Sequence, residues 1–283
     1  MKYLKKQYNN TGTLPNSNLT TKNITDANTL RWYYCEEFNN IFLDAIEDIL
    51  STAEIPYTLN RETFILTLHD KNFFMLFGAY SSSYIKESFF SYPIEIPKNQ
   101  LNVSNISIQN IFTYSGGTEY SYNFKLEVIY TEYSCYIYVT NVYNNYVYTL
   151  LAFTTVKILV DNTETIAYCC FNNMTMYNSN KDAARVHIGM PYNGKSLITN
   201  GAFKSLDGVF RGLSAGYVAP GKNTNYYGWL GNKIPLIPYL DSSYIFQYKG
   251  LYVTYSGQVV AGELYEINGK IYYAYNSSVL MGD

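Results

Sequence analysis

Apolar and polar residues alternate along 121–130, and this period of two constrains the fold more than any other feature of the chain. A strand places successive side chains on opposite faces, so the alternation predicts a strand with one buried and one solvated face. The apolar positions are Tyr122, Phe124, Leu126, Val128 and Tyr130. The same pattern continues through Cys135, Ile137 and Val139. This part of the chain is therefore predicted to be β-structure.

Short polar turns separate this strand from others and predict an antiparallel meander. The dipeptide Asn144-Asn145 favours a two-residue hairpin turn, because Asn tolerates the positive φ of a type I′ turn. Further turns are predicted at 69–71 and 161–164. The predicted strands are 63–68, 72–77, 122–130, 135–139, 146–160 and 165–171.

Glycine becomes frequent after residue 180, which favours short strands and loops over helices. The chain then ends in its sharpest local turn signal, Asn268-Gly269 between two apolar runs. A two-residue turn at this point places Tyr265 directly across from Tyr272. The sequence therefore predicts a terminal β-hairpin with an aromatic cross-strand pair.

One helix is predicted, over residues 30–52, where apolar side chains recur at three- and four-residue spacing. The stripe consists of Leu30, Tyr34, Phe38, Ile41, Ala45 and Ile49. Asp26 or Asn28 could cap its start, and Pro56 closes the region behind it. The preceding segment, 1–29, is polar and predicts an extended arm. A neighbouring subunit is the simplest partner for such an arm.

These patterns together predict a mainly β fold. Its sheets form an antiparallel meander, a sandwich or a barrel, with one N-terminal amphipathic helix and an extended N-terminal arm. The expected organisation is a polar arm (1–29), a helix plus antiparallel β domain (30–180) and a glycine-rich β region (181–283). The last two segments form either one domain or two.

Charged residues make up only 15% of the chain, against about 25% in ordinary proteins, whereas tyrosine occurs 33 times. Interface cores are depleted in charges and enriched in aromatic residues, because burying an unpaired charge is costly. Tyr supplies a large rigid face with a polar rim. The composition therefore favours a contact protein, although an A/T-rich genome would also raise the Tyr and Asn content.

Composition also argues against several classes of protein. The net charge is −2, and no basic block is longer than Lys5-Lys6, so nucleic-acid binding is not expected. No apolar stretch approaches the roughly 20 residues of a transmembrane helix, and the basic start lacks a signal-peptide core. The four cysteines include no CxxC spacing and are expected to be buried reduced thiols. Synthesis in a reducing cytoplasm follows.

Residues 189–196 match the phosphate-binding pattern GxxxxGK[ST], ending in Lys195-Ser196. Such a loop needs a helix that begins at the Lys-Ser pair, with its positive end facing the nucleotide. Here Asn200-Gly201 follows almost at once, so the segment is predicted as strand or turn. A nucleotide site is therefore the least favoured of the functions considered.

No catalytic, metal or cofactor site is predicted. The two histidines, His69 and His187, lack neighbouring cysteines or carboxylates at ligand spacing. His69-Asp70 is expected to be a solvated pair in a tight turn. No GxSxG element is present, and the chain is predicted not to be an enzyme.

One loop carries a candidate contact surface. Tyr226, Tyr227 and Trp229 alternate with amides on a glycine-rich segment. Aromatic rings beside amides suit a protein partner or a stacked sugar. A third interpretation is that Trp229 packs into the core.

The chain resembles virion structural proteins of tailed bacteriophages with A/T-rich genomes. The likeness rests on the aromatic run Arg31-Trp32-Tyr33-Tyr34, the glycine-rich second half and the terminal hairpin over 262–273. It implies a non-catalytic subunit of the tail, neck or capsid surface, assembled in the bacterial cytoplasm and contacting copies of itself and other virion proteins. The alternative is a receptor- or glycan-binding module of the same particle, which would bind a host surface glycan. Neither implies membrane insertion or a cofactor.

Overall fold

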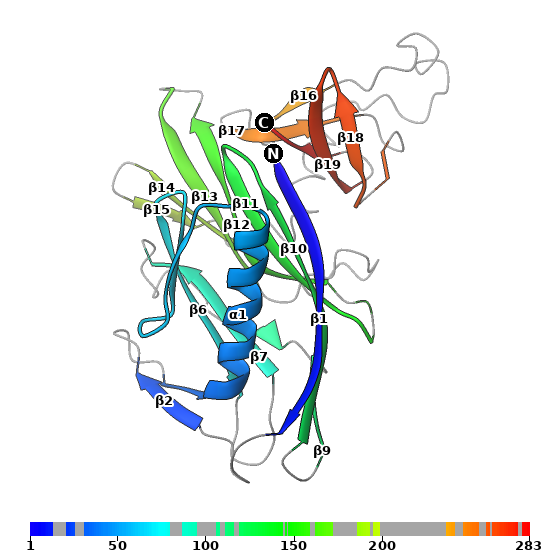
Figure 1. Cartoon of the computed structure of the whole chain (residues 1–283). Coiled ribbons are helices and arrows are strands. Elements are labelled where there is room, and N and C mark those ends of the chain that lie inside the picture. The colour runs from blue at the N-terminus through cyan, green and yellow to red at the C-terminus, as the bar shows by residue number, and fades with distance from the viewer. Residues whose placement is uncertain are drawn as a thin grey trace.

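A computed structural model describes most of the chain and confirms the mainly β, antiparallel fold. The described residues are 1–13, 21–25, 31–79, 87–94, 106–107, 111–115, 119–143, 145, 147–158, 162–171, 186–192, 195–198, 236–240, 246–254, 259–260, 262–276 and 279–283. They form a 13-stranded sheet, a five-stranded sheet, a two-stranded sheet and a single helix, α1 (Glu36–Thr52) (Figure 1).

The large sheet follows the order β1-β10-β11-β12-β17-β20-β19-β18, with side branches at β9, β13–β15 and β16. Its strands are β1 (Lys2–Thr13), β9 (Phe112–Ser115), β10 (Glu119–Tyr130), β11 (Ser134–Asn141), β12 (Val147–Ile158), β13 (Glu164–Phe171), β14 (Val186–Tyr192), β15 (Lys195–Ile198), β16 (Ile237–Leu240), β17 (Phe246–Val253), β18 (Leu264–Ile267), β19 (Lys270–Asn276) and β20 (Val279–Met281).

The predicted meander is confirmed as β10-β11-β12-β13. The link between β11 and β12 is longer than the two residues predicted, because pairing ends at Thr140↔Val147. Asn145 nevertheless has the expected positive φ of 56°. β12 is a branch point, since it pairs with β11, then with β13 and, at its end, with β17.

The five-stranded sheet follows chain order. Its strands are β4 (Thr58–Asn60), β5 (Ile65–Leu68), β6 (Lys71–Ala79), β7 (Glu87–Pro93) and β8 (Ile106–Ser107). The predicted hairpin between β5 and β6 is confirmed, with Leu68 paired to Lys71. His69 and Asp70 both have positive φ, 49° and 58°, as a two-residue type I′ turn requires.

Helix α1 begins at Glu36, whereas the stripe predicted a start at residue 30. Arg31–Cys35 is instead β3, which pairs with β2 (Thr21–Thr25). A spacing of four residues fits both periods, because it returns to one face of a helix and also to one face of a strand. The stripe therefore could not separate the two. Cys35 is the extended cap residue and makes no side-chain capping bond.

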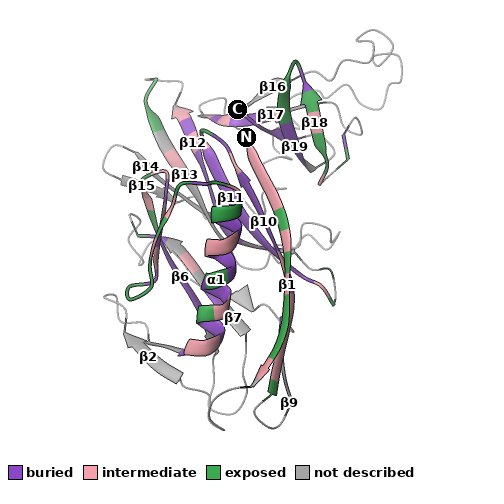
Figure 2. Cartoon of the chain, viewed as in Figure 1, coloured by how far each residue is buried: buried purple, intermediate pink, exposed green. Residues whose placement is uncertain are grey.

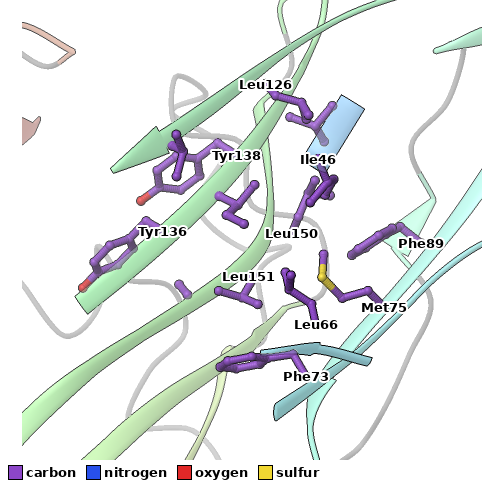
Figure 3. Close-up of a cluster of buried hydrophobic side chains, with 14 of the residues drawn as sticks. Ile46, Leu66, Phe73, Met75, Phe89, Leu126, Tyr136, Tyr138, Leu150 and Leu151 are labelled. Carbon is purple, nitrogen blue, oxygen red and sulfur yellow. The ribbon is translucent and has the colours of Figure 1, made fainter. Parts of the chain in front are cut away.

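The main core lies between α1 and the inner faces of the two larger sheets. Phe42 stacks against Phe77 at 5.1 Å and also contacts Phe89 and Phe124, so one helix side chain touches both sheets. Figure 3 shows Ile46 and Phe89 in the same cluster of buried side chains. The buried stripe of α1 faces inward in Figure 2.

A second, smaller cluster lies in the C-terminal lobe, defined here as the described residues from 236 onward. Its buried members are Val259, Ile267, Tyr272, Ala274 and Leu280. The predicted terminal hairpin is confirmed, with Tyr265 paired to Tyr272. Asn268 and Gly269 have φ of 55° and 77°.

Candidate interaction surface

Strand β1 is the end strand of the large sheet. All of its twelve residues pair with β10, from Lys2↔Tyr130 to Thr13↔Glu119. The opposite side of β10 is taken by β9 and β11. The extended N-terminal segment is therefore held, over its first part, by a strand of its own chain. The other side of β1 makes no backbone–backbone hydrogen bond to any described residue.

The length of this edge sets it apart. The other strands that end a sheet or a branch have two to five residues. They are β2, β3, β4, β8, β9, β15, β16 and β18. Proteins keep open edges short, because unpaired N–H and C=O groups recruit other strands. A twelve-residue open edge is the exception that points to a partner.

The side chains of β1 leave this edge accessible. Lys5, Gln7, Asn9, Asn10 and Thr11 are all exposed. Figure 2 shows β1 as exposed and partly buried along its length, whereas the neighbouring β10 is largely buried. We call the outward side of Lys2–Thr13, together with these five side chains, the β1 edge.

One face of β1 is fastened to α1 through Tyr8. The Tyr8 ring stacks on Phe124 at 5.5 Å, and its hydroxyl donates to Asp48 Oδ2 at 2.7 Å. Burial, helped by Asp48, raises the pKa of Tyr8 well above its usual range. Lys6 Nζ lies 2.6 Å from the same Asp48 oxygen and holds the pKa of that carboxyl below its usual value. Strand and helix are thus locked together.

The other face of β1 is fastened through Lys5. Its Nζ lies 3.0 Å from Glu127 Oε2, and the Glu127 side chain is only 6% exposed. Glu127 Oε1 has no hydrogen-bond partner within the described residues. A buried carboxylate left without its cation is strongly destabilising, so this pair also holds β1 in place.

The beginning of β1 is tied to the C-terminal lobe. Tyr3 stacks on Tyr273 at 5.4 Å, and the Met1 amino group pairs with the Asp283 carboxylate. The two termini lie side by side in Figure 1. Lys270 donates to the Asp283 carbonyl at 3.1 Å. The start of β1 and both ends of the described chain therefore meet beside β19.

A second surface lies at the far end of the sheet. Val260, Leu264 and Ile271 are 59%, 46% and 43% exposed, and Leu264 begins the end strand β18. The flanking Glu263 and Glu266 are also exposed. This patch is apolar but small, and its strand offers only four residues.

The predicted contact residues Tyr226, Tyr227 and Trp229 lie outside the described residues. The phosphate-loop pattern falls on β14 and β15, which pair from Gly189↔Ile198 to Tyr192↔Lys195. Lys195 and Ser196 therefore begin a strand, as predicted, and do not begin a helix. The segment lacks the helix N-terminus that a nucleotide phosphate needs.

His69 lies in the predicted turn but is half-buried, contrary to the solvated pair expected. Its ring stacks on Tyr130 at 4.4 Å, and Nε2 lies 3.0 Å from the Thr131 carbonyl oxygen. Burial lowers its pKa. The residue packs the β5–β6 turn against the large sheet, because its ring also meets the edge of Phe153.

Cys35 and Cys135 are buried free thiols, as predicted, and burial raises the pKa of both. Within the described ranges, no three His, Cys, Asp or Glu side chains gather as metal ligands would. The described helix is too short and too polar to cross a bilayer.

The pairing of β1 with β10 could not be recognised from the sequence. Residues 2–13 show no sustained alternation, and their partner is more than a hundred residues away. The available signals were Tyr3, Leu4 and Tyr8, the aromatic and apolar residues of a segment that is otherwise polar.

Comparisons with known proteins found no relatives for this chain. No family model matches the sequence. Searches of curated proteins and of solved structures also gave no significant match.

Proposed function

We propose that this chain is a non-catalytic structural subunit that makes protein–protein contacts in a multi-copy assembly. The observation that carries the proposal is the β1 edge, twelve residues long and open on one side in the described structure. Sheet edges bind other chains through backbone hydrogen bonds. The low charge and high tyrosine content of the sequence suit the same role.

The rigidity of β1 supports a contact that is built in advance. Lys5, Lys6 and Tyr8 hold both faces of the strand on the body of the molecule. A partner that adds to this strand therefore orders little of it on binding, and preorganisation of this kind strengthens association. The setting we propose is the particle of a tailed bacteriophage, at the tail, neck or capsid surface, on the strength of the sequence resemblance.

The test is the mass of the native protein. Light scattering and native mass spectrometry, at concentrations from about 1 to 100 µM, are expected to give multiples of the 32.5 kDa chain. A monomer throughout this range, with no association with other particle proteins, contradicts the proposal. The phage setting is tested separately, by mass spectrometry of purified particles, where the chain is expected in many copies.

A further inference from the structure

We infer that the partner of the β1 edge is the β1 edge of a second copy of this chain. The two strands run antiparallel around a two-fold axis perpendicular to the sheet, near Gln7 and Tyr8. Two 13-stranded sheets then join into one continuous sheet. This inference rests on the proposed function and identifies the contact through which copies associate.

Geometry restricts how two copies of one strand can pair. In antiparallel pairing, directly opposite residues share a face, and a two-fold axis places one residue opposite its own copy. Pairing centred on Gln7 engages residues 2–12, and pairing centred on Tyr8 engages 3–13. Every other centre leaves more of the strand unpaired. The length of β1 therefore favours these two registers.

Charge independently favours the same two registers. Centring on Lys5 or Lys6 would place a lysine directly opposite its own copy, which is destabilising. Centring on Gln7 places Lys5 opposite Asn9, and centring on Tyr8 places Lys6 opposite Asn10. The lysines lie in the first half of β1 and the amides in the second half. The strand is therefore complementary to itself when reversed.

The lysines also bear on the choice between a second copy and an acidic partner strand. Lysines on an edge can repel other strands, or attract acidic ones, when their charges are free. Here Lys5 pairs with the buried Glu127, and Lys6 pairs with Asp48. Both lysine charges are therefore already paired with carboxylates of the same subunit. A neutral, amide-rich partner such as residues 7–13 of another copy therefore fits better than an acidic one.

Nothing in the strand itself blocks pairing. Residues 2–13 contain no proline, and the pairing of β1 with β10 runs without a bulge. Helix α1 contacts β1 through Asp48, on one face of the sheet, and leaves the edge open. Figure 1 shows β1 at the rim of the sheet with α1 on its inner side.

Cross-linking of single cysteine variants tests the contact. Gln7→Cys, treated with a short bis-maleimide, is expected to give a covalent dimer, because the two copies lie within about 8 Å in either register. Thr11→Cys is the matched control, exposed on the same strand. Its two copies are about 20 Å or more apart, from six to eight residues of strand rise. The unaltered chain under the same conditions measures any background from its own cysteines.

Charge placed on the second half of β1 gives an independent test. Asn9→Lys with Asn10→Lys sets new lysines opposite Lys5 or Lys6 of the other copy and should weaken the dimer roughly three- to thirtyfold. Asn9→Glu with Asn10→Glu should not strengthen the dimer, because Lys5 and Lys6 are already paired with Glu127 and Asp48 within their own subunit. The neutral pair Asn9→Gln with Asn10→Gln should leave it unchanged. Circular dichroism confirms that each variant folds.

The outcomes separate this inference from the proposed function. One outcome is a multimeric protein in which Gln7→Cys gives no cross-linked dimer on a denaturing gel and the charge variants leave association unchanged. In that case the contact between copies lies outside the β1 edge, and the proposed structural role is retained. Cross-linking of Thr11→Cys to itself overturns the register. A protein that is monomeric and joins no particle overturns both proposals.

Discussion

The β1 end and the β18 end of the large sheet differ in length, in the core beneath them and in charge. β1 has twelve residues, carries three lysines and is packed on the main core through Tyr8 and Phe124. β18 has four residues, with exposed Glu266 within the strand and exposed Glu263 just before it, and its hairpin packs on the small cluster of the C-terminal lobe. The lobe is joined to β1 chiefly by Tyr3, Tyr273 and the contacts of Asp283.

This difference shows two ways of managing an open edge. At the β18 end, the open edge is only four residues long, which is too short to bind a long partner strand. The other side of β18 is paired with β19 in the terminal hairpin. At the β1 end, the strand is long and firmly held, so its edge is a stable template for another chain. The two ends are also expected to open separately, because opening free energy follows the buried contacts of each region.

Phe42→Ala is expected to have the largest effect, because Phe42 joins α1 to both sheets under the β1 end. Removing a fully buried ring should lower the free energy of unfolding by about 3–5 kcal/mol. Urea unfolding followed by circular dichroism measures the change. The exposed Tyr143→Ala is the control and should shift stability by less than about 0.5 kcal/mol. Equal effects of the two variants would contradict the described core.

Leu280→Ala should act on the lobe alone. Leu280 is fully buried in the small cluster, and its loss is expected to destabilise the lobe by about 2–3 kcal/mol. Hydrogen exchange should speed up in β18, β19 and β20 while β10 and β11 stay protected. If β10 exchanges faster to the same extent, the two clusters form one cooperative unit and the comparison fails.

Gly269→Ala should destabilise the C-terminal lobe less than Leu280→Ala does. Gly269 has φ of 77°, and a Cβ there would meet no atom within 4 Å, so the strain is purely conformational. The expected loss is about 1–2 kcal/mol, felt in the terminal hairpin. The melting temperature of the lobe measures it. Asn268→Gly, at the neighbouring positive φ, serves as the control and should be nearly neutral.

Asp48→Asn should have the smallest effect on stability, at the β1 end. Lys6 lowers the pKa of Asp48 in the folded state, so its contribution is present above the ordinary carboxyl pKa of about 4 and is lost as pH falls below it. The pair is partly exposed, so the difference between variant and native protein should stay below about 1 kcal/mol at pH 7 and shrink toward pH 3.

Hydrogen exchange gives the matched control for Asp48→Asn. The variant should exchange faster along β1, because Lys6 loses its ion pair and the Tyr8 hydroxyl loses a charged acceptor. Asp44→Asn makes the same chemical change on the same helix, but its partner Arg61 lies outside β1. Unchanged exchange in β1 for Asp48→Asn would show that the stacked Tyr8 ring alone holds the strand.

The hairpins were predictable because their causes are local. Asn268-Gly269 and the turn at 69–71 contain residues that tolerate positive φ, and the flanking strands follow within a few residues. The strand over 121–130 was predictable because its apolar residues alternate, but the solvated second face was not confirmed, since Glu127 and Ile129 are buried as well. The start of α1 was not predictable, because Tyr34 fits both a helical stripe and a strand. The pairing of residues 31–35 with β2 makes this segment a strand.

The sequence predicted that the chain carries a contact surface, but not which residues form the candidate surface. Composition indicated a contact protein, but it directed attention to Tyr226, Tyr227 and Trp229, which lie outside the described residues. The β1 edge carries amides and lysines, and only its position at the rim of the sheet makes it notable. No property of residues 2–13 by themselves reveals that one side is paired and the other open.

The sequence by itself determined the antiparallel β class, the turns at 69–70 and 268–269 and the body of the helix, because local periodicity and backbone preference decide them. The tertiary structure alone decided which strand ends the sheet, which lysines are neutralised and how the two termini meet. These depend on contacts between residues more than a hundred positions apart, such as Lys5 with Glu127 and Tyr3 with Tyr273. Such contacts form only when the whole sheet assembles.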